Sequence, residues 1–162
     1  MGTRSTIALE FADGTVEQVY CHWDGYLEHN GQILLKHYSN PFILRDLIDL
    51  GDISSLKPTI GTKHAFSHFE LRAEEVAEYK VLTENMTTFY GRDRGETGTD
   101  KKSFVDFQDY LAHHQYEEYD YILRNVNGKA TWFVSDHDGA YVELEQAIMD
   151  EQDSIAQEET AE

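Results

Sequence analysis

The pair Asn127-Gly128 constrains the fold more than any other feature of the sequence. It separates two strand-like runs, 119–126 and 129–135, which are rich in aromatic and β-branched residues. Asn and Gly both tolerate the positive φ angles of a two-residue type I′ turn. The sequence therefore predicts an antiparallel β-hairpin over 119–135.

A second hairpin is expected near the N-terminus. Apolar residues alternate with other residues over 5–11, which is the pattern of a half-buried strand. Asp13-Gly14 is a turn signal, and the segment from Val16 to Trp23 supplies the second strand.

Helices are expected between the two hairpins. The best-marked one begins after the potential cap Asn40, has Pro41 in its first turn and ends before Gly51. Another is expected over 103–114. Strands at both ends with helices between them favour an α+β fold, in which an antiparallel sheet built from the two hairpins carries helices packed on it.

Three further segments are less sharply defined. Tyr79–Leu82 and Thr87–Tyr90 read as strands, and 91–99 reads as a polar loop. Beyond Gly139 a helix is expected to about Met149. The 162 residues are then assigned to a single domain, 1–149, followed by an acidic, disordered tail, 150–162.

The chain is strongly acidic, with 31 acidic and 13 basic side chains and a net charge of −18. Such a charge repels phosphates, so direct binding to nucleic acid or to an anionic membrane is not expected. Two interpretations remain open: the charge only keeps the protein in solution, or it imitates nucleic acid and engages a basic partner surface. The single cysteine, Cys21, and the absence of a long apolar run favour the cytoplasm.

The block Tyr20–Tyr26 is the first candidate site, with His22, Trp23, Asp24 and Tyr26 as ligand-binding residues. On a continuing strand His22 and Asp24 share a face, and one of them, together with His29 or His37, could form an acid–base pair or bind a metal or a ligand. The alternative is a strand end at which the aromatic residues cap the core and His22 bonds to backbone.

The block Tyr90–Glu96 is the second candidate site, with Tyr90, Arg92, Asp93 and Arg94 as ligand-binding residues. Two guanidinium groups in a glycine-punctuated loop are suited to clasping a phosphate or a carboxylate. The alternative is a surface loop held by its own Arg–Asp–Glu pairs.

No metal or cofactor is expected. The sequence has no paired cysteines and no His-Glu-x-x-His pattern. Asp136-His137-Asp138-Gly139 does not fit a calcium loop, because Val134 falls where the first acidic ligand is required.

Five stretches together resemble a family of small phage and prophage proteins that has no assigned activity. These stretches are Arg4-Ser5-Thr6-Ile7-Ala8, the blocks 20–26 and 90–96, Gly31 with His37-Tyr38, and 50–56. They spread over roughly 4–125, although family members often have proline where this chain has Leu27. The resemblance implies a phage accessory context and carries no catalytic residues.

Two functional hypotheses follow, and they leave open whether the protein is an enzyme. The first is a non-enzymatic phage accessory protein in the host cytoplasm that binds and modulates a host or anti-phage defence component, with nucleic-acid mimicry as one version. The second is a pocket that joins His22 and Asp24 to Arg92 and Arg94. Such a pocket would sequester or hydrolyse a phosphorylated or nucleotide-like small molecule. A third, plainer possibility is an interaction module whose histidines and arginines only order loops.

Overall fold

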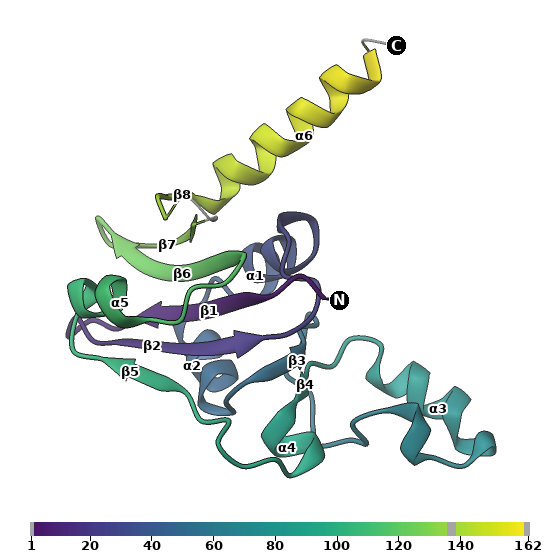
Figure 1. Ribbon diagram of the computed structural model, residues 1–162. Coiled ribbons are helices and arrows are strands. Elements are labelled where there is room, and N and C mark those ends of the chain that lie inside the picture. Colours follow the sequence, from purple (N-terminus) through teal and green to yellow (C-terminus); the bar gives the residue numbers. More distant parts are fainter. Residues whose placement is uncertain (1, 136–138, 161–162) are drawn as a thin grey trace.

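The two predicted hairpins form the centre of one β-sheet in the computed structural model, which describes residues 2–135 and 139–160 (Figure 1). At the turn of the second hairpin, φ is 53° at Asn127 and 85° at Gly128, as the type I′ prediction requires. The strands are β1 (Ser5–Glu10), β2 (Val16–Cys21), β3 (Ile53–Ser55), β4 (Thr88–Phe89), β5 (Lys102–Phe104), β6 (Tyr119–Val126), β7 (Lys129–Ser135) and β8 (Tyr141–Glu143). The helical segments are η1 (Leu27–Gly31), α1 (Gln32–His37), α2 (Pro41–Asp49), η2 (His68–Glu70), α3 (Ala73–Thr83), α4 (Tyr90–Arg94), α5 (Phe107–His113) and α6 (Leu144–Thr160).

The sheet is mixed, with the strand order β4-β3-β2-β1-β6-β7-β8 and with β5 paired to β2. Most neighbours are antiparallel. The exceptions are the short β2–β3 contact and the central β1–β6 pair, which is parallel from Ser5 opposite Tyr119 to Leu9 opposite Leu123. The α+β class is confirmed, and the two hairpins join through this parallel pair.

The main core lies on one face of the sheet, under α1, α2 and the start of α6. Residues on the strands alternate between the two faces, so Ile7 and Leu9 enter this core while Ala8 points to the other face. Helix α2 is fixed as predicted: the Asn40 side chain accepts a hydrogen bond from the Phe42 N–H, and Pro41 occupies the first turn. The opposite face carries a smaller core that α5 covers with Tyr110.

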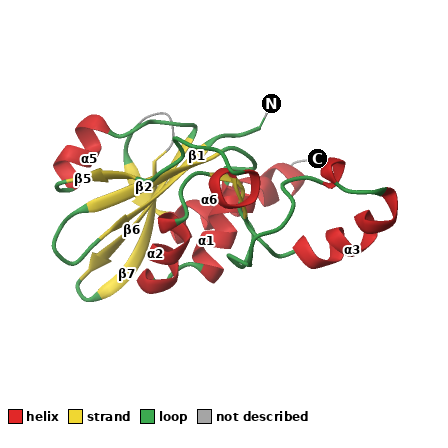
Figure 2. Cartoon of the chain, turned by 90° about the horizontal axis from the view of Figure 1, so that it is seen from below, coloured by secondary structure: helices red, strands yellow, loops and turns green. Residues whose placement is uncertain are grey.

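Two helices extend away from the sheet (Figure 1). Helix α3 has no buried residue, and Figure 2 again places it apart from the sheet. Helix α6 packs on the body through Leu144 and Ile148 near its start, and its remaining residues run outward. No helix within the described residues combines the length and the apolar character needed to cross a membrane.

Several sequence-based expectations are wrong in detail. The start of the helix expected over 103–114 belongs to strand β5, and the helix expected after Gly139 is preceded by strand β8. Tyr79–Leu82, expected as a strand, lies within α3, because the surrounding Ala, Glu and Lys residues favour a helix over the full window. The start of the expected 91–99 loop belongs to helix α4. The tail expected to be disordered from residue 150 is helical as far as Thr160, since its Gln, Glu and Ala residues are good helix formers.

Candidate functional site

The block 20–26 continues the edge of β2 against β3. The N–H groups of His22 and Trp23 donate to the carbonyls of Ile53 and Ser54, at 3.0 Å each. The His22 Nδ1 lies 2.7 Å from the Tyr20 hydroxyl, so this imidazole is bonded within its own strand. The hydrogen-bond partner of this nitrogen is thus the Tyr20 side chain, and not a backbone group as in the strand-end alternative.

Asp24 serves the backbone of the turn that follows. Its φ is 58°, in the left-handed region, which Asp tolerates better than most residues. The carbonyl of Asp24 accepts from the Asn30 N–H, and the next carbonyl, of Gly25, accepts from the Tyr121 hydroxyl at 2.6 Å. The conformation of this turn accounts for an aspartate at this position without any ligand.

Beneath the turn, the fully buried Asn30 holds the block together. Its side-chain amide lies 3.3 Å from the Ser5 hydroxyl, the Cys21 sulfur and the Trp23 carbonyl. Burial raises the pKa of the Cys21 thiol to about 11, so the thiol stays protonated and is a poor nucleophile at neutral pH. Of the predicted ligand-binding residues in this block, Trp23 and Tyr26 present exposed ring surface.

In the second block, Arg92 has no donor left for a ligand. A guanidinium group has five N–H donors. Those of Arg92 go to the carbonyls of Ile60, Gly61 and Thr87 and to both carboxylate oxygens of Asp93, over 2.8–3.2 Å. The same group lies over the Phe89 ring, with the guanidinium carbon 4.6 Å from the ring centre.

Asp93 is satisfied in the same way. Its side chain is fully buried, and besides Arg92 it accepts from the N–H groups of His64 and Phe89 at 3.1 and 2.8 Å. The carboxylate therefore joins α4 to the end of β4 and to the 60–64 segment. This Arg92–Asp93 pair is an internal clasp, and the anion-binding role of the loop stays a prediction.

Arg94 and Tyr90 lie on the outer side of α4. The Arg94 guanidinium stacks 4.6 Å from the Phe66 ring centre and 5.2 Å from that of Tyr90, and it pairs with Glu96 at 2.7 Å. About half of the Arg94 side chain is exposed. Of the two arginines in the second block, Arg94 is therefore the more exposed to solvent, although its guanidinium is already paired with the Glu96 carboxylate.

The two blocks bond to the same short segment, residues 52–54 at the start of β3. The carbonyl of Ile53 accepts from His22, and the carbonyl of Asp52 accepts from Tyr90. In the described part of the chain, however, no hydrogen bond or ion pair connects His22 or Asp24 with Arg92 or Arg94. The hypothesis of a shared phosphate pocket has no support from this geometry.

A buried polar cluster on the α5 side of the sheet was missed by the sequence analysis. The Thr6 hydroxyl donates to Asp120 at 2.6 Å, and burial raises the pKa of this carboxyl to about 6. The His114 ring stacks on Tyr110 at 4.1 Å, and its Nε2 lies 3.4 Å from the Tyr141 hydroxyl. Burial lowers the pKa of His114, so the ring is neutral. One feature of the sequence could have indicated this cluster. Asp120 is an acidic residue inside a predicted strand, and it lies on the same face of that strand as the apolar Ile122.

Helix α6 contains the densest unbalanced charge among the described elements. Its 17 residues include six acids and no Lys or Arg. The acids are Glu145, Asp150, Glu151, Asp153, Glu158 and Glu159. Met149 and Ile155 are 51% and 39% exposed on the same helix. This combination makes α6 the candidate interaction surface.

No three His, Cys, Asp or Glu side chains converge as a metal site within residues 2–135 and 139–160. The segment 136–138, which the calcium-loop comparison involved, lies outside the described residues. Comparison of the chain with protein-family models, with curated proteins and with solved structures found no match.

Proposed function

We propose that this chain is a non-enzymatic phage accessory protein that acts in the host cytoplasm by binding a host or anti-phage defence component with a basic surface. The single observation that carries the proposal is α6, an acidic helix that leaves the body after two buried residues, Leu144 and Ile148. The phage context comes from the sequence resemblance.

The charge spacing on α6 supports the nucleic-acid-mimicking version of this function. From Glu145 to Glu159 the helix rises about 21 Å at roughly 1.5 Å per residue. Its six acids then give about one negative charge per 4 Å, close to the roughly 3.4 Å of a single DNA strand. A basic groove that follows a phosphate backbone meets a comparable charge density on this helix.

The state of the reactive groups favours binding over catalysis. The Cys21 thiol is buried and protonated, and Arg92 and Asp93 are bonded to each other and to the backbone. His22 is engaged by Tyr20. The chemically dense blocks are therefore used to hold the fold, whereas the acids of α6 other than the partly buried Glu151 stay accessible to a partner.

The test compares two variants with the same change in charge. The α6 variant replaces Asp150, Asp153, Glu158 and Glu159 with the corresponding amides. The matched control does the same to Glu74, Glu75, Glu78 and Glu84 in and after α3. Each protein is used to capture partners from a bacterial host extract, and the affinity of each captured partner is measured across salt concentrations.

The proposal expects a partner that is lost with the α6 variant, kept by the control, and bound more weakly as salt rises from low to physiological concentration. Added duplex DNA should compete for that partner. Equal capture by both variants, or an affinity that salt does not change, would contradict the proposal.

A further inference from the structure

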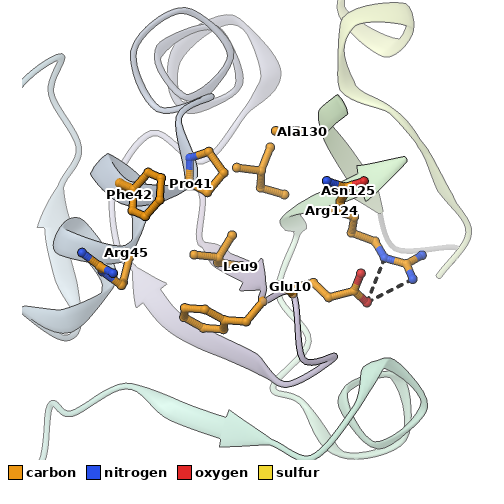
Figure 3. Close-up of a pocket in the computed structure, with 11 residues that line it drawn as sticks. Leu9, Glu10, Pro41, Phe42, Arg45, Arg124, Asn125 and Ala130 are labelled. Carbon is orange, nitrogen blue, oxygen red and sulfur yellow. Dashed lines mark hydrogen bonds and ion pairs between the residues drawn. The ribbon is translucent and has the colours of Figure 1, made fainter. Parts of the chain in front are cut away.

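A pocket between β1 and α2 is not used by the proposed function (Figure 3). Its cavity volume is about 250 Å³. It lies where the ends of β1, β6 and β7 meet the start of α2, and the residues used below are Leu9, Phe42, Arg45, Leu123, Arg124 and Ala130.

The pocket is mainly apolar. Leu9 and Leu123 belong to the main core and are almost fully buried, so they form a fixed base. Phe42 is 68% exposed at the first turn of α2 and stands beside the pocket as a wall. A ligand that covered this ring would remove apolar surface from water, which favours binding in proportion to the area buried.

The two arginines at the rim are not equivalent. Arg124 donates twice to the Glu10 carboxylate, at 3.1 and 3.2 Å, and lies 3.6 Å from the Phe107 ring centre. Figure 3 shows this pair on one side of the pocket and Arg45 on the other. The nearest acid to Arg45 is its neighbour Asp46, at 3.7 Å, and nearly half of the Arg45 side chain is exposed.

Arg45 therefore keeps donors for an anion beside an apolar hollow. Positive charge is scarce in a protein with 13 basic and 31 acidic side chains. At physiological salt, acids more than about 8 Å from Arg45 are largely screened, so they repel a bound anion only weakly. A ligand that fits such a site has a hydrocarbon chain and one anionic group at its end.

The volume limits the size of that ligand. About 250 Å³ is below the roughly 300–1,000 Å³ of pockets for drug-sized molecules. We propose that the pocket binds a small apolar carboxylate, such as a medium-chain alkanoate. Its hydrocarbon chain covers Leu9, Leu123 and Phe42, and its carboxylate pairs with Arg45. This inference does not depend on the proposed function.

Octanoate is the test ligand for the full chain, with leucine methyl groups labelled for NMR. Saturable shifts are expected at Leu9 and Leu123. Hexanoate, shorter by two methylenes, should bind roughly tenfold more weakly. Octylamine, with the opposite charge, should bind more weakly than octanoate. No saturable shift at these leucines, or octylamine binding as tightly as octanoate, would overturn the proposal.

Three variants separate the two parts of the site. Arg45→Gln should weaken octanoate about two- to fivefold and leave neutral octan-1-ol unchanged, since an exposed ion pair contributes modestly. Phe42→Ala, at an exposed position that does not threaten folding, should weaken both ligands, and octanoate at least as much as octan-1-ol, because the Arg45 guanidinium carbon lies 5.5 Å from the Phe42 ring centre. Arg72→Gln, at an exposed arginine just before α3 and outside the pocket, should change neither. If Arg45→Gln behaves like Arg72→Gln, the carboxylate subsite is wrong.

Discussion

The segments 20–31 and 87–96, which contain the two blocks, contrast with helix α6 in how their polar groups are used. In these segments the central polar side chains are directed inward: Asn30 and Asp93 are buried and multiply bonded, while Arg94 and Glu96 remain at the surface. In α6 the acids lie on a helix whose outer part touches little of the body. The segments that are dense in different polar residue types therefore hold the fold, whereas the acidic segment keeps most of its side chains exposed.

The largest change in stability is expected when the Arg92–Asp93 clasp is broken. Arg92→Ala should lower the free energy of unfolding by about 3–5 kcal/mol, because it leaves Asp93 as a buried carboxylate without its cation. Arg94→Ala, which removes an exposed ion pair, should cost about 1 kcal/mol or less. Urea denaturation of both variants measures the difference. Equal, small losses would contradict the stabilising role of the Arg92–Asp93 clasp.

A second prediction concerns Asp120 and pH. Its pKa is raised by burial from 3.8 to about 6, so the folded state favours the protonated carboxyl. The stabilisation from this group is complete below pH 3.8 and is lost as the pH rises through 6. Between pH 4 and pH 7 the wild type should lose up to about 3 kcal/mol relative to Asp120→Asn.

This pH effect is read from urea midpoints of both proteins across that range. Because the other acids titrate in both proteins, the comparison isolates Asp120. Parallel curves for the two proteins would show that Asp120 is ionised in the fold at no cost, contrary to the buried cluster described here.

The smallest effect is expected from α6 itself. Removing residues 153–162 should change the free energy of unfolding by about 0.5 kcal/mol or less, since the described part of that segment is exposed. Ile148→Ala, in the docked part of the same helix, should cost about 2–4 kcal/mol. Thermal and urea unfolding of the two variants test this division within one helix. A truncation as costly as Ile148→Ala would show that the outer part also packs on the body.

The sequence predicted features that depend on neighbouring residues. Asn127-Gly128 specifies its turn by local backbone preference, and Asn40 with Pro41 specifies the start of α2. The parallel pairing of β1 with β6 joins residues more than 100 positions apart, and no local pattern encodes it. The two hairpins were therefore predictable, but their junction was not.

The same limit explains the candidate site. The carbonyls that occupy Arg92 belong to Ile60, Gly61 and Thr87, and the first two lie about thirty positions away. Without those partners in view, a conspicuous arginine reads as a free anion-binding group. The helical tail was missed for a related reason, since a low apolar content predicts weak packing but does not by itself prevent a helix.

Amide hydrogen exchange of the full chain tests the central contrast most directly. We predict that the amides of Asn30, His64 and Phe89, which donate to Asp24 or Asp93 of the two blocks, exchange only through global unfolding. The amides of α3 and of α6 beyond residue 152 should exchange through local opening, at a much lower free energy. Exchange of the block amides as fast as those of the two projecting helices would contradict the account.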